Sequence, residues 1–167
     1  MLVAHTSSVD ATRDLGAALA EIARPSDLVL LAGDLGAGKT AFAQGFGRGL
    51  GIADRITSPT FTLASEYQGA RLRLHHLDVY RFEDMAEVFD VDLPELLDDD
   101  AVVLVEWGDA IAPAVPADYL EVRITLGEGD DDRTVAFRAV GPSWSARSRA
   151  LATICAPWSE GAGGKAG

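Results

Sequence analysis

The chain contains very little lysine and almost no cysteine. Two of its 167 residues are lysines, Lys39 and Lys165, and 14 Lys and Arg stand against 26 Asp and Glu, a formal net charge of −12. Such a surface repels the backbone of nucleic acids, so autonomous binding of DNA or RNA is not expected. The single Cys155 excludes an internal disulfide, and we expect it to be a small buried hydrophobe.

Long hydrophobic runs are also missing. No apolar stretch approaches the length that crosses a membrane, and residues 1–5 lack the length and positive charge of a secretory signal. We therefore expect a cytoplasmic protein with no membrane partner. Its hydrophobic content of 48% is ordinary for a globular protein and enough to build a core.

One segment carries a complete phosphate-binding pattern. Residues 33–40 read Gly-Asp-Leu-Gly-Ala-Gly-Lys-Thr, which matches G-x-x-x-x-G-K-[ST]. The apolar run 28–32 before it is typical of a buried strand, and apolar residues recur at helical spacing from Phe42 to Leu50, where Gly51 ends the predicted helix. Backbone N–H groups and a helix N-terminus bind phosphate in such a loop. The sequence therefore predicts binding of a nucleoside triphosphate.

A Mg²⁺ ion bound beside the phosphate loop needs a second protein ligand from elsewhere in the chain. Lys39 is expected to bridge the β- and γ-phosphates, and the Thr40 hydroxyl to ligate Mg²⁺. The other anchor is normally an acid at the end of a buried strand. Glu106 follows the apolar residues 102–105 and is our candidate, with an exposed acid at a strand end as the alternative. Trp107, next to it, either packs in the core or shapes the site.

Two pairs of segments predict β-hairpins. Residues 61–67 and 71–80 flank a short turn, and the alternating segment 119–126 is answered by residues 135–139 across an acidic turn. In the second hairpin, alternation predicts that Leu126 faces the same way as Leu120, Val122 and Ile124.

One strand of the first hairpin has polar residues at alternate positions. Period two puts His76, Asp78 and Tyr80 on one face, where they could point together into a site. Polar strand faces are usually just hydrated, so this pattern alone is weak evidence. His75 and His76 have no third ligand in a metal-binding pattern, and we predict no metal site from them.

The remaining segments complete an α/β fold. Residues 2–5 predict a first strand, and Ser7 begins a helix with a capping-box-like start. We predict a P-loop NTPase fold with a mainly parallel central sheet flanked by helices and added antiparallel hairpins. Residues 1–142 would form this domain and residues 143–167 a C-terminal extension, disordered from Pro157 onward.

The absence of further motifs narrows the class of nucleotide protein. The guanine motif N-K-x-D cannot occur, because the only other lysine is Lys165, and D-x-x-G is absent. The arginine-rich lid expected of a small-molecule kinase is missing, since residues 82–122 contain no basic residue. With these two classes disfavoured, we expect by elimination that the nucleotide is ATP and that its role is regulatory or slowly hydrolytic. A small-molecule phosphotransferase and a non-enzymatic nucleotide sensor stay as alternatives.

The segment 83–100 is strongly acidic. It holds nine acids and no Lys or Arg. A solvated helical face with a loop explains it, and so does docking to a basic protein surface.

Together these motifs resemble the bacterial TsaE (YjeE) ATPases, over roughly residues 6–140. The phosphate loop looks like that of the family in full. Residues 58–61, Ser-Pro-Thr-Phe, are similar to its switch-like segment, and residues 76–81 to its H-x-D-x-Y-R signature. Val-Glu-Trp at 105–107 is similar to its metal-side strand end. Asp109 replaces a longer acid of many members, and no family motif matches after residue 140.

The resemblance implies a Mg²⁺-dependent, slowly hydrolysing ATPase that is stimulated by partners. Its role would be in forming the threonylcarbamoyl group on the adenosine beside the tRNA anticodon. The transfer itself is done by the TsaD–TsaB pair, on which the family docks. Contact with tRNA would be indirect, through that complex.

The resemblance also implies roles for single residues. Asp78 becomes a catalytic or water-positioning residue, and Thr60 a sensor of the γ-phosphate. The implied catalytic residues are Lys39, Asp78 and Glu106, and the implied metal ligands are Thr40 and Glu106. The implied ATP-binding residues are Thr12, Gly36, Ala37, Gly38, Lys39, Thr40, Ala41, Thr60, Trp107 and Arg133.

Overall fold

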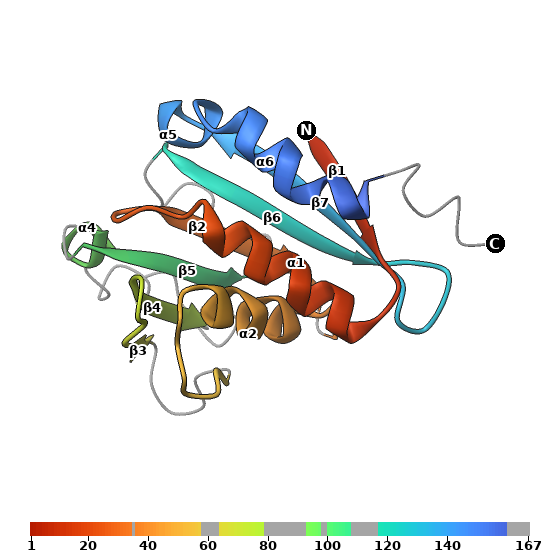
Figure 1. The fold of residues 1–167 in the computed structure, drawn as a ribbon, viewed down its shortest axis with the longest axis horizontal. Helices are drawn as coiled ribbons and strands as arrows, with labels where there is room; N and C mark the ends of the chain where they lie inside the picture. Colours follow the sequence, from red (N-terminus) through yellow and green to blue (C-terminus); the bar gives the residue numbers. More distant parts are fainter. Residues whose placement is uncertain (35, 58–63, 79–92, 98–99, 108–116, 160–167) are drawn as a thin grey trace.

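The computed structural model describes residues 1–34, 36–57, 64–78, 93–97, 100–107 and 117–159. These residues form a seven-stranded sheet with helices packed against it (Figure 1). The strands are β1 (Leu2–Thr6), β2 (Leu28–Gly33), β3 (Ala64–Tyr67), β4 (Arg73–Asp78), β5 (Ala101–Trp107), β6 (Tyr119–Leu126) and β7 (Arg133–Val140). The helices are α1 (Val9–Glu21), α2 (Lys39–Gly49), α4 (Leu93–Leu97), α5 (Pro142–Ser145) and α6 (Ser148–Cys155), followed by the 3₁₀ turn η3 (Ala156–Trp158).

The centre of the sheet is parallel and its edges are antiparallel. The strand order is β1-β7-β6-β2-β5-β4-β3, and β6, β2, β5 and β4 run parallel to their neighbours within this group. Strands β7 and β1 extend one side and β3 the other, all in antiparallel pairing. The predicted α/β P-loop fold with a mainly parallel centre is therefore confirmed. Strand β6 belongs to both parts, because it pairs with β2 as well as with its hairpin partner β7.

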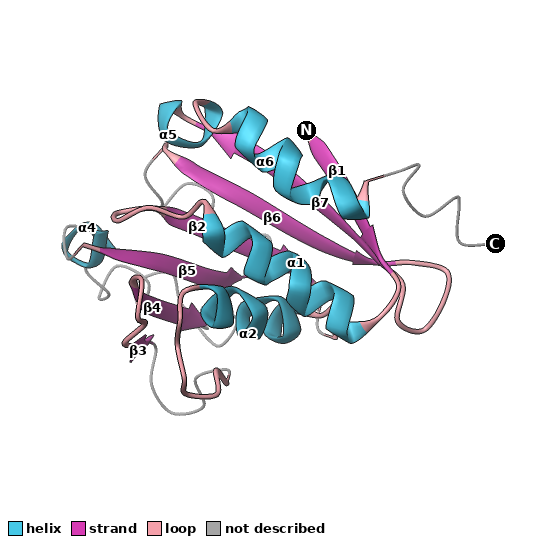
Figure 2. Ribbon diagram, viewed as in Figure 1, coloured by secondary structure: helices cyan, strands magenta, loops and turns pink. Residues whose placement is uncertain are grey.

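Helices α1, α2 and α6 cover one face of the sheet (Figure 2). Side chains from these helices and from alternate strand positions form the larger core cluster, in which Phe42, Phe46 and Leu15 are fully buried. On the other face, Leu30, Val103 and their neighbours form a smaller cluster against which α4 packs. With apolar groups on both sides, β2 is buried from Leu28 to Ala32, as its uninterrupted apolar run predicts.

One detail of the predicted elements is wrong, and one apolar residue is more exposed than the apolar residues before it on its strand. Helix α1 is capped by Ser8, whose hydroxyl accepts a hydrogen bond from the Ala11 N–H at 3.0 Å, and not by Ser7. A capping residue has an extended backbone and stands three residues before the N–H group whose hydrogen bond its side chain accepts. Ser7 stands four residues before the Ala11 N–H, one position too early. Leu126 is 61% exposed, because it ends β6 beside the turn, beyond the cover of the helices.

Helices α1 and α2 approach each other at glycines. A Cβ on Gly45 would lie 1.8 Å from the carbonyl oxygen of Arg13, and a Cβ on Gly16 would lie 2.3 Å from that of Phe42. Both distances are far below van der Waals contact, so the backbones meet only because these positions carry no side chain. This contact holds α2 firmly against α1, and α2 follows directly from the phosphate loop.

The C-terminal helices pack on the same core. Trp144, Leu151 and Cys155 join the cluster formed by α1 and α2. Regular structure continues past Pro157, where the sequence predicts the start of disorder: η3 includes this residue, and Ser159 bridges to Ala4. Residues 160–167 lie outside the described part, and the division at residue 142 stays a prediction.

Both predicted hairpins are present where the structure describes them. Strand β3 pairs with β4, and β6 with β7 around the acidic turn, in which the Gly127 N–H donates to the Asp132 carbonyl at 2.8 Å. In the acidic segment 83–100, α4 confirms one helical piece, and residues 83–92 and 98–99 are outside the described residues. Of the helices described, none has the length and apolarity needed to span a membrane.

Candidate phosphate-binding site

The loop at residues 33–40 connects the centre of the sheet to α2, with Leu35 outside the described residues. Gly36 and Gly38 have φ values of 82° and 107°, in the region that glycine adopts without strain. A Cβ on Gly36 would meet no atom within 4 Å, so the space in front of the loop is open there. The Ala37 N–H donates to the Asp34 carbonyl at 3.0 Å and closes the turn before α2 begins at Lys39.

Lys39 lies at the centre of this site. Its side chain is buried, and its Nζ donates a hydrogen bond to the Gly33 carbonyl at 2.6 Å. Burial lowers the pKa of the Lys39 ammonium, while the charges of Glu106, Asp78 and Asp34 raise it again. The lysine predicted to bind phosphate is therefore held among three carboxylates, two of which are the predicted catalytic acids.

Asp78 and Glu106 lie side by side at the carboxyl end of the sheet. They are register partners in the parallel pair of β4 and β5, and Glu106 is also paired with Leu31 of β2. Asp78 is 8% exposed and Glu106 is 3% exposed. The alternative interpretation of Glu106 as an exposed strand-end acid is therefore wrong. Two buried acids at the ends of adjacent parallel strands, with the lysine that begins α2, form a site suited to a phosphate and its cation.

His76 also reaches this site, although the sequence analysis assigned it no role. It is fully buried two residues before Asp78, and its Nε2 lies 3.5 Å from Oε2 of Glu106. Among the described residues, neither ring nitrogen of His76 nor Oε1 of Glu106 has a hydrogen-bond partner. A buried polar atom without a partner costs about 1–3 kcal/mol. The alternation along this strand had indicated that His76 and Asp78 share one face and could point together into a site, and the structure brings both to Glu106.

Thr12 and Arg133 border the phosphate loop at Gly38. A Cβ on Gly38 would lie 3.9 Å from Cγ2 of Thr12 and 3.8 Å from Nε of Arg133. The Thr12 hydroxyl shares a 2.7 Å hydrogen bond with that of Thr6. Arg133 Nε donates to the Ala37 carbonyl at 2.8 Å, so this arginine contacts the phosphate loop itself.

Of four further predicted site residues, the structure describes two in full, one without its side chain and one not at all. Thr40 and Ala41 lie in the first turn of α2, Thr40 exposed and Ala41 half-buried. Trp107 ends β5, but its side chain is outside what the structure describes, and so is the whole of Thr60. The ATP-binding roles of these four residues stay predictions.

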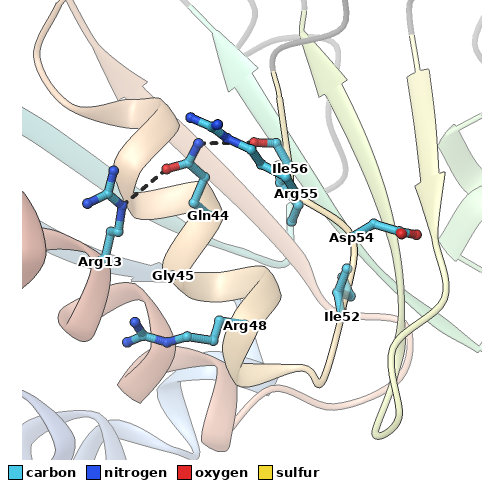
Figure 3. Close-up of a pocket in the computed structure, with 8 residues that line it drawn as sticks. All are labelled: Arg13, Gln44, Gly45, Arg48, Ile52, Asp54, Arg55 and Ile56. Atoms are coloured by element: carbon cyan, nitrogen blue, oxygen red, sulfur yellow. Dashed lines mark hydrogen bonds between the residues drawn. The ribbon is translucent and has the colours of Figure 1, made fainter.

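A separate cavity lies outside the phosphate loop. Its volume is about 290 Å³, and it is lined by residues of α1, of α2 and of the segment that follows α2 (Figure 3). The sequence analysis did not predict it. Its lining residues are Arg13, Gln44, Gly45, Arg48, Ile52, Asp54, Arg55 and Ile56.

Comparison with known proteins identifies the family. Residues 6–135 match the family described as "Threonylcarbamoyl adenosine biosynthesis protein TsaE". The chain belongs to the TsaE family. The matched region contains the phosphate loop and every predicted site residue, from Thr12 to Arg133.

Relatives in several bacterial groups agree. The TsaE protein of Bacillus subtilis (strain 168) is 43% identical over 137 residues, which cover 82% of this chain and 85% of the relative. The TsaE protein of Streptomyces coelicolor is 40% identical over 139 residues, covering 80% and 93%. Both carry the name "tRNA threonylcarbamoyladenosine biosynthesis protein TsaE".

A solved structure has the same fold as this TsaE-family chain. The crystal structure of Bacillus subtilis YdiB superposes with a TM-score of 0.75 at 36% sequence identity. The match covers 91% of this chain and 94% of the other. The likeness therefore extends beyond the family match at residues 6–135.

Proposed function

We propose that this protein binds ATP with Mg²⁺, hydrolyses it slowly, and acts in the formation of threonylcarbamoyladenosine in tRNA. The observation that carries the proposal is the meeting of Lys39, Asp78 and Glu106 beside a complete phosphate loop. Family membership supports the biological role, because the relatives are named for tRNA threonylcarbamoyladenosine biosynthesis.

The phosphates of ATP would bind at the N-terminus of α2. The loop N–H groups and the positive end of the helix attract the anion, and Lys39 adds a full charge. Lys39 is buried and already surrounded by carboxylates, so it is oriented before the nucleotide arrives. A bound triphosphate would favour the protonated ammonium, and we expect nucleotide binding to raise the pKa of Lys39.

The residues present fit a magnesium ion. Glu106 has a buried carboxylate oxygen without a hydrogen-bond partner in the described part of the chain, and Thr40 is an exposed residue that carries a hydroxyl in the first turn of α2. These two would hold Mg²⁺, as hard oxygen ligands suit it. The ion would supply neutralisation of the charge on the phosphates.

Asp78 is the candidate for handling the attacking water. In hydrolysis the water oxygen forms a bond to the γ-phosphorus while the bond to the β–γ bridging oxygen breaks and ADP leaves. Asp78 lies beside Glu106 and within electrostatic reach of Lys39, so its carboxylate can orient the water and accept a proton from it.

The partners in this proposal are the TsaD–TsaB pair, on which the protein would dock in the cytoplasm. The net charge of −12 disfavours direct tight binding of tRNA, and tRNA would be reached through the complex. This charge suits a component whose contacts are with proteins.

The experiment that tests the proposal measures ATP hydrolysis by the purified protein, alone and with the TsaD–TsaB pair. We expect low activity alone, a clear rise with the pair, and loss of both in Lys39→Ala. An unchanged rate with the pair would refute the docking partner. Labelled γ-phosphate on a metabolite instead of free phosphate would refute the hydrolase in favour of a phosphotransferase.

One substitution separates binding from turnover. Asp78→Asn keeps the shape of the side chain but removes its ability to accept a proton, so we expect hydrolysis to fall ~10²–10⁴-fold. ATP affinity should stay within a few-fold of the unsubstituted protein, as measured with a fluorescent ATP analogue. Normal hydrolysis by Asp78→Asn with the partners present would show that Asp78 has no catalytic role.

A further inference from the structure

His76 occupies an unusual position for a polar side chain. It lies on β4 with no exposed surface, on the sheet face that α1 and α2 cover. On this face its neighbours are Leu74 and Asp78 on the same strand and its register partners Leu104 on β5 and Ser65 on β3. Leu74 and Leu104 are fully buried, and a leucine would pack against them as well, so packing alone gives no reason for an imidazole.

The Glu106 carboxylate lies close to the imidazole ring. The 3.5 Å between His76 Nε2 and Glu106 Oε2 is slightly longer than a hydrogen bond, and no other described residue satisfies either ring nitrogen. Hydrogen bonds at functional sites are often long without ligand and shorten when the ligand binds. The two side chains are therefore close enough to complete a bond after a small movement.

We propose that His76 is a positioning residue for Glu106. Its Nε2–H donates to Oε2 of Glu106 when the nucleotide and its cation are bound. This leaves Oε1, the other buried oxygen, directed to the cation. The inference rests on the proposed nucleotide function and adds to it a residue that acts through Glu106.

A second support for Glu106 is needed because Lys39 competes for it. Lys39 and Glu106 are both buried in this site, and their opposite charges attract each other. A glutamate with free side-chain torsions would turn toward this ammonium and withdraw from the metal. A donor fixed on the sheet holds one carboxylate oxygen in place, as partners behind metal ligands do in other proteins.

The test uses Mn²⁺ as a spectroscopic substitute for Mg²⁺. The affinity of Mn²⁺ for the protein–ATP complex is measured by electron paramagnetic resonance, which does not depend on turnover. His76→Leu removes the donor at similar volume, and we expect Mn²⁺ affinity to fall ~10–100-fold. His76→Gln places an amide N–H near the original Nε2, and we expect it to restore affinity to within a few-fold.

Two further variants distinguish positioning from general damage. In a Glu106→Gln background, adding His76→Leu should lower Mn²⁺ affinity no further, because the residue through which it acts is already changed. His75→Leu is the matched control: the neighbouring histidine is also buried but points to the opposite sheet face. It should leave Mn²⁺ affinity unchanged.

The possible outcomes separate the inference from the proposed function. If the unsubstituted protein binds no Mn²⁺–ATP, both are overturned. If it binds and His76→Leu binds equally well, the positioning role is wrong and the nucleotide function stands. If His76→Leu fails to fold, His76→Asn is compared with His76→Gln, since the shorter amide cannot reach Glu106. Equal Mn²⁺ affinity in these two variants overturns the inference.

Discussion

At the scale of single residues, the site is organised around a few buried charges. Lys39 and Glu106 were predicted from local patterns, and the structure brings them together with Asp78. Arg133 was predicted only through the family resemblance, and the structure gives it a contact: a hydrogen bond to the Ala37 carbonyl of the phosphate loop. Its guanidinium also donates to the carbonyls of Asp130 and Asp132, so it ties the loop to the hairpin turn.

Removing the hydrogen bonds of Arg133 should weaken nucleotide binding. In Arg133→Ala the loop loses the 2.8 Å bond that fixes the Ala37 peptide. We expect ATP affinity to fall ~10-fold, the equivalent of one hydrogen bond from a charged donor. Titration with a fluorescent ATP analogue measures it. Arg138→Ala is the control on the same strand, because Arg138 is exposed and pairs with Glu121 at 2.5 Å; equal losses in the two variants would contradict the role of Arg133.

Cys155 gives a prediction on thiol chemistry. Burial raises its pKa from 9.0 to about 12, so the reactive thiolate is scarce at pH 8. We expect alkylation by iodoacetamide to be slow in the native protein and fast in urea. Because the pKa is raised in the folded state, ionisation of the thiol should lower stability as the pH rises from about 9 toward 12. Equal alkylation rates in the two states would show that the thiol is accessible.

At the scale of elements, the close packing of α1 and α2 positions the helix that begins with Lys39. The helical period of α2 was readable in the sequence, but the role of its glycines was not. Helix propensity alone would favour alanine over glycine at Gly45. Only the structure shows that the backbone of α1 takes the space of that methyl group.

Gly45→Ala should therefore destabilise the protein. Its Cβ would lie 1.8 Å from the Arg13 carbonyl oxygen, which cannot move without shifting α1. We expect a loss of about 1–3 kcal/mol in the free energy of unfolding, measured with urea, and weaker ATP binding as Lys39 shifts. Gly47→Ala is the comparison on the same helix: its Cβ would lie 2.0 Å from Cδ1 of Ile56, a side-chain end that can move without shifting a backbone, so we expect a smaller loss. A stability gain in Gly45→Ala would show that the helices can separate without cost.

At the scale of the whole molecule, one buried ion pair joins the C-terminal helices to the rest. Arg147 donates two hydrogen bonds to Asp27, at 2.6 and 2.7 Å, and a third to the Ile22 carbonyl at 2.9 Å. Its guanidinium also stacks 3.9 Å from the centre of the Trp144 ring. These contacts attach the C-terminal helices to the end of α1 and the start of β2.

Breaking this pair should destabilise the protein strongly. Arg147→Met leaves the Asp27 carboxylate buried without its cation, and we expect a loss of about 3–5 kcal/mol in the free energy of unfolding. Adding Asp27→Leu should recover part of the loss, because the orphaned charge is then gone. Arg149→Met, exposed on the same helix, is the control. A single urea transition near the original midpoint in Arg147→Met would contradict the predicted linkage.

The sequence alone was most reliable where one feature lies within a short stretch of chain. Strand β2, the phosphate loop and α2 were predicted together, because hydrophobic period, glycine pattern and helix end are local signals. The cap of α1 was missed by one position, since Ser7 and Ser8 are alike in sequence and differ only in backbone conformation. The buried His76 was assigned no role because its neighbours come from another strand.

What the sequence by itself determined is therefore the phosphate-loop motif and the family. What only the tertiary structure decided is which distant groups complete the site. Arg133 contacts Ala37 across 96 positions of chain, and Arg147 contacts Asp27 across 120. Asp78 meets Glu106 because β4 and β5 pair in one particular register. Strand order and register arise from burial across the whole sheet, so no single segment specifies them.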